Sequence, residues 1–395
     1  MYFIAANTAL QIKKGSNDPM KRMISLLLAV TMVICLCACG KEPVETEPAT
    51  APITTEPTTE PTTESTTEPT TEPTTEPAPV YTNPLTGVVV DEPVQSRVFA
   101  VTINNLQDAM PHYGVAEADI FMEMFVNHSI IRGLALYSNV ANVYSIGSVR
   151  SDRLMFNDIV QHYDAVIAHA GGSSQVLTEA NSLGLDHFNI DTWDDSGYSY
   201  RDKTRNNQGY SWDACLFARG EGLVQHADEL GMRVTQDPEK DYRLIFAEDG
   251  TPAGGEVAET ITVTFSYGGS RKDSTMSYDE SLGKYVYHQY GKMMTDGMTN
   301  APEAFENVVI LMTNIGKNGI YHVADFVAGG DGYFACGGQL IPMKWHCDSE
   351  DSPFYFTTVD GEPLAFGVGS SYFAIAPIGS PVVYGALEAP ETQGQ

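Results

Sequence analysis

Residues 40–80 form a low-complexity tract, and this tract constrains the fold of the chain more than any other feature. It repeats Thr-Thr-Glu-Pro and contains nine prolines, fourteen threonines and nine glutamates. Such a composition cannot bury enough apolar surface to offset the entropy lost on ordering. Prolines favour extended polyproline II structure and the glutamates repel one another. We therefore expect a disordered, stretched tether of on the order of 100 Å, at about 3.1 Å per residue.

A short apolar segment precedes the tether. Lys21 and Arg22 are followed by an apolar run over residues 23–38, which is too short for a comfortable transmembrane helix. A basic start followed by an apolar run is typical of a signal peptide, and Met20 is its natural first residue. We therefore expect the residues before Met20 to be an upstream mis-start.

The signal peptide is expected to end at a lipidated cysteine. In Leu36-Cys37-Ala38-Cys39-Gly40 a small residue stands directly before Cys39, with an aliphatic residue two places before that. A lipoprotein signal peptidase accepts this pattern. We predict that residues 1–39 are a lipoprotein signal peptide. Cys39 would carry the lipid, such as palmitate, and anchor the chain to the outer face of a bacterial cytoplasmic membrane. The alternative is an ordinary secretory signal whose cysteines are incidental.

The part of the chain after the tether is strongly acidic. The protein has 395 residues and a formal net charge of −29. The leader carries a net +3 and the tether −8, so −24 belongs to the remainder. This charge argues against binding nucleic acid or an anionic surface through bulk attraction. A hydrophobic fraction of 43% is enough to build a core.

Hydrophobic periodicity predicts strands and helices in a first folded part, residues 83–235. Apolar runs predict strands over residues 97–103, 130–137 and 164–169. An apolar stripe with helical spacing predicts a helix with Ser151 as its N-cap. A second helix is expected after Gly171-Gly172-Ser173, and Gly184 would end it. Residues 186–222 are rich in Asp, Tyr and Trp, a pattern that predicts a loop.

A second folded part, residues 256–385, follows a polar, glycine-rich connection over residues 238–255. Apolar and polar residues alternate there with a period of two, as at Ile261, Val263 and Phe265, and the last hundred residues have the pattern of β-hairpins. We therefore predict an α+β fold. Its first half would contain layered mixed β-sheets with helices, and its second half would be largely antiparallel β.

Three cysteines lie in the folded parts, and we expect their thiols to be free. Gly337-Gly338 predicts a two-residue hairpin turn that places Cys336 opposite Gln339. Cys347 then lies about 26 Å further along the strand, too far for a disulfide. Cys336, His346 and Cys347 do not have the ligand spacing of a zinc site. The third cysteine, Cys215, completes the set of structural thiols.

Motifs along both parts, taken in order, resemble those of the YerB-type bacterial lipoprotein family. In the first part they are Asn83-Pro84-Leu85-Thr86-Gly87, Ser148-Val149-Arg150-Ser151, Tyr163-Asp164-Ala165, His169-Ala170-Gly171-Gly172-Ser173 and Tyr200-Arg201-Asp202-Lys203-Thr204-Arg205. In the second part they are Gly332-Tyr333-Phe334, Lys344-Trp345 and the segment 372–377. The resemblance implies a two-part domain of layered sheets and helices whose biochemical activity is uncharacterised. The chain departs from the family pattern at Asn127-His128 and Gln208-Gly209.

Basic residues are rare in the folded parts but concentrated in one stretch. Six of seventeen fall between residues 132 and 205: Arg132, Arg150, Arg153, Arg201, Lys203 and Arg205. Arg150 and Arg153 lie at a predicted helix start, where the helix dipole disfavours cations by about a few tenths of a kcal/mol. An anion bound there would compensate, and sequence that breaks a local rule is often functional. The alternative is that carboxylates such as Asp152 pair with these arginines.

His169 is a second candidate, because it ends a predicted buried strand before the Gly171-Gly172-Ser173 turn. Ligands gather at such strand ends in α/β arrangements. The turn lacks both the Gly-x-Gly-x-x-Gly pattern and the lysine of a P-loop, so nucleotide binding is not supported. The alternative is a neutral histidine that hydrogen-bonds the turn.

These observations predict a binding protein for an anionic component of the cell envelope. The predicted ligand-binding residues are Arg150, Arg153, His169, Arg201, Asp202 and Arg205, with Asp202 orienting an arginine. We predict no catalytic residue, metal, cofactor or nucleic-acid partner, and expect the membrane to be reached through the lipid anchor. Two alternatives stay open: an envelope hydrolase with His169 as base, and a protein–protein interaction module whose acidic surface meets a basic partner.

Overall fold

One large β-sheet runs through both predicted parts of the chain. The computed structural model describes residues 80–193 and 195–387. The predicted signal peptide, Cys39 and the tether up to residue 79 lie outside the described residues. Within the sheet, β4 (Ile120–Asn127) of the first part pairs in parallel with β25 (Ser371–Pro377) of the second. The two parts therefore share a continuous hydrogen-bonded framework.

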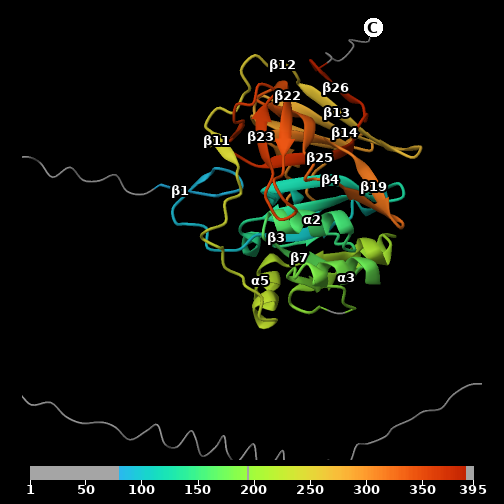
Figure 1. The fold of residues 1–395 in the computed structure, drawn as a ribbon. Coiled ribbons are helices and arrows are strands. Elements are labelled where there is room, and N and C mark those ends of the chain that lie inside the picture. The colour runs from blue at the N-terminus through green and yellow to red at the C-terminus, as the bar shows by residue number, and fades with distance from the viewer. Residues whose placement is uncertain (1–79, 194, 388–395) are drawn as a thin grey trace, which may run out of the picture. The chain divides into compact units, whose positions relative to one another are not determined.

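The first part supplies one end of this sheet and the helices (Figure 1). Its further sheet strands are β3 (Phe99–Ile103), β5 (Ile130–Tyr137), β7 (Val166–His169) and β8 (His187–Asn189). β3, β7 and β8 run parallel, whereas β5 is antiparallel to β3 and β4. The helices are α2 (Leu154–His162), α3 (Ser174–Ser182), α4 (Lys203–Asn207) and α5 (Gly220–Glu229).

Short elements connect these strands and helices. Two small sheets contain β1 (Tyr81–Thr82) with β2 (Val89–Val90), and β6 (Ile146–Gly147) with β10 (Leu216–Ala218) and β9 (Ser199–Arg201). The 3-10 turns are η1 (Gln107–Ala109), η2 (Val115–Glu117), η3 (Val140–Asn142) and η4 (Trp212–Ala214). Two of these regions contribute residues to the candidate site: η4, and the segment that connects β6 to α2.

The second part extends the large sheet and adds a second sheet. Besides β25, its strands in the large sheet are β12 (Glu256–Val257), β18 (Asn307–Thr313), β19 (Ile315–Asn318), β20 (Tyr321–Ala324), β21 (Gly330–Cys336), β22 (Gln339–His346) and β23 (Tyr355–Thr358). The six-stranded second sheet contains β13 (Thr260–Tyr267), β14 (Ser270–Asp279), β15 (Lys284–Gln289), β16 (Lys292–Met293), β17 (Ala304–Phe305) and β26 (Val382–Gly385). A separate parallel pair joins β11 (Ile245–Ala247) to β24 (Ala365–Gly367).

Two apolar cores lie on the two faces of the large sheet. One packs the six-stranded sheet against it, with the rings of Phe125 and Phe265 at a centroid distance of 6.2 Å. The other packs α2 against the opposite face, where Met124 is buried with Phe156. Successive side chains of β4 point to alternate faces and so serve both cores. The result is an α+β fold of layered mixed sheets with few helices.

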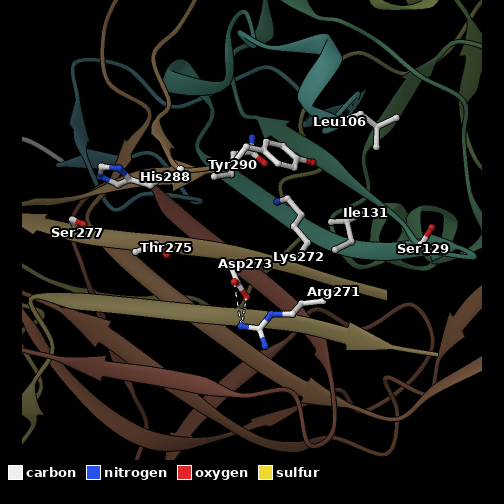
Figure 2. A pocket seen from close by; sticks show the side chains of 12 residues that line it. Leu106, Ser129, Ile131, Arg271, Lys272, Asp273, Thr275, Ser277, His288 and Tyr290 are labelled. Carbon is white, nitrogen blue, oxygen red and sulfur yellow. Dashed lines mark hydrogen bonds and ion pairs between the residues drawn. The ribbon is translucent and has the colours of Figure 1, made fainter. Parts of the chain in front are cut away.

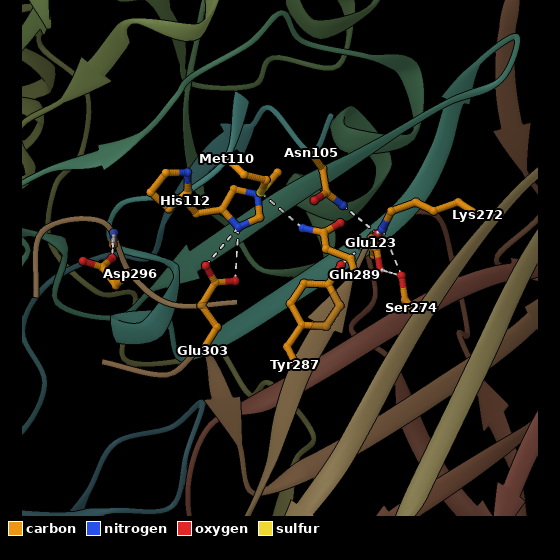
Figure 3. Close-up of polar contacts among 12 residues, drawn as sticks. Asn105, Met110, His112, Glu123, Lys272, Ser274, Tyr287, Gln289, Asp296 and Glu303 are labelled. Atoms are coloured by element: carbon orange, nitrogen blue, oxygen red, sulfur yellow. Dashed lines mark hydrogen bonds and ion pairs between the residues drawn. The ribbon is translucent and has the colours of Figure 1, made fainter. Parts of the chain in front are cut away.

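A buried ion-pair network joins the two parts between these layers (Figure 3). Glu123 of β4 pairs with Lys272 of β14. The Glu123 carboxylate also accepts hydrogen bonds from Asn105 Nδ2 (2.6 Å), Ser274 Oγ (2.7 Å) and Tyr372 Oη (2.5 Å). Burial raises the pKa of Glu123, but the Lys272 ammonium and the hydrogen bonds from Tyr372 and Ser274 lower it more, so the pKa lies below its ordinary value. The carboxylate is therefore ionised, and protein groups contact both of its oxygen atoms.

A second buried pair supports the same junction. His112 of the first part and Glu303 of the second have no exposed side-chain surface. The His112 Nδ1 atom lies 3.1 Å from each carboxylate oxygen of Glu303 (Figure 3). Because removing one member of such a pair leaves an uncompensated buried group, the two pairs hold the parts in a fixed register.

Several local predictions are confirmed. Ser173 caps α3, and its Oγ accepts a hydrogen bond from Val176 N (3.4 Å). Cys336 pairs with Gln339 across the predicted hairpin turn. The described cysteines, Cys215, Cys336 and Cys347, are all free and buried. Apart from these predictions, no helix among residues 80–193 and 195–387 is long and apolar enough to cross a membrane.

Two predictions for the first part are wrong. Ser151 is not the N-cap of α2. The N-cap is Arg153, and its side chain makes no capping hydrogen bond. The chain before α2 is instead held extended across the strand ends, because Asp152 N donates to Gly171 O (2.9 Å). Residues 186–222 are not a loop but contain β8, β9, β10, α4 and the start of α5. Elements of three to five residues are too short to show a clear hydrophobic period.

Candidate functional site

Three arginines gather where the chain enters α2, and we call Arg132, Arg150 and Arg153 the arginine triad. Arg132 comes from β5 and is 2% exposed, Arg153 is the N-cap of α2, and Arg150 precedes it. Burial, Arg153 and Arg150 together lower the pKa of Arg132 to about 8, which Asp213 and Tyr321 offset only in part. Burial also lowers the pKa of Arg153, Tyr321 and Asp152 oppose that shift in part, and Arg150 adds to it. The three like charges therefore repel one another in a poorly hydrated place.

The triad has few protein partners for its charge. Arg132 Nη1 donates to the carbonyl of Ser151 (2.8 Å), but its buried Nε has no hydrogen-bond partner among the described residues. Arg150 Nη1 pairs with Asp213 Oδ2 at 2.7 Å, and its Nε is also buried without a partner in that part of the chain. Among residues 80–193 and 195–387, Asp213 is the one carboxylate that forms an ion pair with the triad.

Arg153 is held by neutral groups rather than by a carboxylate. Its Nη1 donates to the carbonyl of Asp152 (2.5 Å) and its Nε to Asn127 Oδ1 (3.5 Å). Its guanidinium carbon lies 5.7 Å from the ring centroid of Tyr321, a distance that permits a cation–π interaction. These contacts orient the guanidinium group without neutralising it.

Asp152 supplies less negative charge than its position suggests. Its side chain is buried, and burial raises its pKa to about 7 even though the backbone amide and the charge of Arg153 lower it. Its Oδ1 accepts a hydrogen bond from Arg153 N (2.7 Å), whereas Oδ2 has no partner among the described residues. At neutral pH this carboxyl is about half protonated, so positive charge remains in excess at the triad.

The backbone places the triad at the carboxyl ends of parallel strands. Arg150 N donates to Thr102 O of β3 (3.1 Å), and Ala170 N, directly after β7, donates to Arg150 O (2.9 Å). Asn104 N, one residue past β3, donates to Ser148 O (2.8 Å). Ligands of open α/β sheets bind outside such strand ends, and the segment that carries Arg150 crosses this edge.

Arg201 and Arg205 were predicted to join the site, but the structure gives them other partners. Arg201 donates to the carbonyls of Thr192 (3.1 Å) and Trp212 (2.6 Å) and pairs with Asp191. Arg205, which is 4% exposed, donates to the carbonyls of Pro111 (3.0 Å) and Ala109 (2.6 Å). No hydrogen bond or ion pair among the described residues joins either arginine to the triad.

Asp202 caps a helix, and no hydrogen bond or ion pair among the described residues joins its carboxylate to an arginine side chain. Its Oδ1 accepts hydrogen bonds from the backbone amides of Thr204 (2.8 Å) and Arg205 (3.1 Å), at the start of α4. An aspartate at this position satisfies amides that the helix leaves unpaired. The predicted role for Asp202 is therefore corrected to that of an N-cap.

His169 lies at the end of β7, as predicted, but it is buried in a histidine pair. Its Nε2 is 3.1 Å from His187 Nδ1, and the two rings stack at 5.3 Å. Burial, and then His187, lower the pKa of His169 to about 4. The ring is therefore neutral at pH 7 and a weak proton acceptor, which weakens the alternative of a hydrolase with His169 as base.

Comparisons with known proteins give a family but no reaction. The family model "Protein of unknown function (DUF3048) N-terminal domain" matches residues 85–233. The model "Protein of unknown function (DUF3048) C-terminal domain" matches residues 261–373. "Putative lipoprotein YerB" of Bacillus subtilis (strain 168) is 26% identical over 302 residues, which cover 74% of this chain and 86% of that protein.

A solved structure has the same fold. The crystal structure of the YerB protein from Bacillus subtilis has a TM-score of 0.66 and 22% sequence identity, and the match covers 76% of this chain and 99% of that one. Both family domains and the relative lie along the range in which the sequence motifs were found. The chain therefore belongs to the DUF3048 family of proteins of unknown function, as its resemblance to YerB-type lipoproteins predicts.

Proposed function

We propose that this protein is a lipid-anchored extracytoplasmic protein that binds an anionic group of the cell envelope at the arginine triad. The observation that carries the proposal is Arg132, a buried guanidinium group with one carbonyl partner and two like-charged neighbours. A phosphate or carboxylate group between the guanidinium groups would remove the repulsion and satisfy the unpaired N–H donors. Such charge-assisted hydrogen bonds are about twice as strong as neutral ones.

The location rests on the sequence and on the relative. Residues 20–39 have the layout of a lipoprotein signal peptide that ends at Cys39, and the Bacillus subtilis relative is named a lipoprotein. An anchored chain with a tether of on the order of 100 Å would hold the site away from the bilayer. The ligand would then be a component of the envelope rather than a metabolite of the cytoplasm.

Phosphate-dependent stability tests this proposal. Thermal unfolding of the full chain in a mild detergent is measured against phosphate and pyrophosphate, for the wild type and for Arg150→Gln. At about 100 times its dissociation constant, a bound anion stabilises the native state by about 2.7 kcal/mol. We expect this stabilisation in the wild type and its loss in Arg150→Gln.

The chain offers a closely matched control. Arg219 pairs with Asp195 at 2.7 Å, as Arg150 pairs with Asp213, and the exposed fractions of the two arginines are 28% and 24%. Arg219→Gln therefore removes a similar surface ion pair outside the triad, and phosphate should stabilise it as it does the wild type. Equal stabilisation of Arg150→Gln and Arg219→Gln would contradict an anion site at the triad.

A further inference from the structure

A cavity of about 690 Å³ opens at the free edge of β14, and no arginine of the triad lines it (Figure 2). β14 pairs with β15 only over Ser274–Asp279, so its segment 271–273 has β13 on one side and no strand on the other among the described residues. The first part of the chain closes the cavity with Leu106, Ser129 and Ile131. Its volume falls within the range of about 300–1,000 Å³ that is usual for small-molecule sites.

Tyr290 forms one wall of this cavity in an unusual backbone conformation. It has φ +54° and the next residue, Gly291, has φ +72°, so both central residues of the turn between β15 and β16 are left-handed. Asn, Asp or Gly is preferred at the first of these positions, and a left-handed conformation costs a larger residue about 1–2 kcal/mol. The Tyr290 hydroxyl donates to Asn105 O (2.8 Å) and fixes the ring. A strained residue held in this way often marks a ligand site.

The charges at the cavity are balanced within the protein. Arg271 Nη2 lies 3.2 Å from an Asp273 carboxylate oxygen, and Lys272 pairs with the buried Glu123. Burial lowers the pKa of His288, so its ring is neutral at pH 7. The cavity therefore lacks the excess positive charge of the triad and does not select for an anion.

The remaining wall is rich in groups that exchange hydrogen bonds. Hydroxyl groups of Ser129, Thr275 and Ser277 line it, together with the side chain of Gln289. Gln289 is 1% exposed, and its Oε1 is buried with no hydrogen-bond partner among the described residues. An unsatisfied buried acceptor costs about 1–3 kcal/mol unless a donor reaches it. The wall hydroxyl groups, rather than this enclosed acceptor, are therefore the groups that a ligand meets directly.

We propose that this cavity is a second binding site and that it takes a neutral saccharide. A sugar ring presents C–H groups that pack on an aromatic face such as Tyr290, and hydroxyl groups that both donate and accept hydrogen bonds. The pairing of one aromatic wall with neutral donors and acceptors fits that chemistry. This inference does not depend on the anion site, since the two sites share no residue and select for different charge.

Binding of chitotriose (the trimer of N-acetylglucosamine) and of maltotriose tests the proposal. Calorimetric titration uses the full chain in a detergent without sugar headgroups. The informative variant is Tyr290→Asn, because asparagine suits the left-handed turn position. It removes the ring, its hydrogen bond to Asn105 and its contact with the Lys272 ammonium, which lies 5.5 Å from the ring centroid. We expect at least one trisaccharide to bind the wild type, and its affinity to fall at least about tenfold in Tyr290→Asn.

Two controls make the test specific. Tyr144→Asn removes an exposed tyrosine that does not line this cavity, and Arg150→Gln alters the triad; both should bind the trisaccharide as the wild type does. The saccharide site is overturned if neither trisaccharide binds the wild type, or if Tyr290→Asn binds it unchanged. A Tyr290→Asn variant that loses its stabilisation by phosphate but still binds the trisaccharide would also overturn the proposal. The cavity would then select for an anion rather than for a neutral ligand.

Discussion

Two groups of arginines look alike in the sequence but have different surroundings in the structure. Arg201 and Arg205 each donate to two backbone carbonyls, and the rings of Trp212 and Tyr210 lie 4.7 and 4.2 Å from them. Arg205 Nε is buried without a partner among the described residues, as Arg132 Nε is, so the number of carbonyl partners distinguishes the two arginines. In the triad, buried Arg132 has one carbonyl partner and two cationic neighbours. A local excess of basic residues thus identifies candidates, whereas the supply of protein acceptors separates structural arginines from ligand-binding ones.

Replacing one arginine of each group by methionine should separate them most strongly. Methionine keeps the apolar volume of the side chain. Arg205→Met leaves the carbonyls of Ala109 and Pro111 without their charged donor, so we expect a loss of about 4 kcal/mol in the free energy of unfolding. Arg132→Met removes one hydrogen bond but also a buried repulsive charge, and its free energy of unfolding should change by less than about 1 kcal/mol. Urea denaturation measures both.

In anion binding, the variant with the smaller loss of stability should show the larger effect. Arg205→Met should retain its stabilisation by phosphate, whereas Arg132→Met should lose it. If Arg132→Met were destabilised as much as Arg205→Met, Arg132 would be a structural arginine like Arg205, and the triad would not be a ligand site.

The protonation of Asp152 sharpens the comparison further. Its pKa is raised to about 7 in the folded state, so raising the pH through this value places a new negative charge beside Arg153. That charge competes with a bound anion. Sulfate, which stays doubly charged over this range, should bind about tenfold more weakly at about pH 8.5 than at about pH 5.5. Titration of sulfate at several pH values measures the effect.

Asp152→Asn is the matched variant for this experiment, because it keeps the shape of the side chain and removes the titration. Its sulfate affinity should change less with pH than that of the wild type, because only Arg132, whose pKa is about 8, still loses charge over this range. At about pH 8.5 the affinity of the variant should exceed that of the wild type. The folded state also retains a proton on Asp152 that the unfolded chain releases from its ordinary pKa near 3.8 upward. Stability should therefore fall between about pH 4 and 7 in the wild type relative to the variant. A sulfate affinity independent of pH in the wild type would place the anion away from Asp152.

The sequence predicts some long regular elements well, misses others such as β4 (Ile120–Asn127), and predicts the short elements poorly. β5 was predicted over 130–137 and observed as Ile130–Tyr137, because an eight-residue apolar strand has a clear pattern. The pairing of β4 with β25 could not be predicted, since the partners lie about 250 residues apart and nothing local specifies a parallel neighbour. The loop prediction for 186–222 failed where tertiary packing stabilises elements of three to five residues.

The candidate site shows the same limit. Arg150 and Arg153 were predicted from their position before an amphipathic helix, and both belong to the triad. Arg132 was noted as a basic residue but not placed in the site. A signal was present: Arg132 alternates with Leu134 and Leu136, both buried on the α2 side of the sheet. A charged residue in a buried register indicates either a partner or a ligand, and only the structure shows that Arg132 lacks a carboxylate partner.

His169 should show the smallest effect and gives the last test of which residues belong to the site. Its Nε2 is directed to His187 and its ring is neutral above about pH 4, so it contributes no charge to the anion. We expect His169→Gln to change the phosphate affinity by less than about twofold, or about 0.4 kcal/mol. The unfolded chain protonates this histidine below about pH 6.5, whereas the folded state does not. The contribution of His169 to stability, which rises between about pH 4 and 6.5, should therefore be lost in the variant. A loss of affinity as large as that of Arg150→Gln would instead bring the carboxyl end of β7 into the anion site.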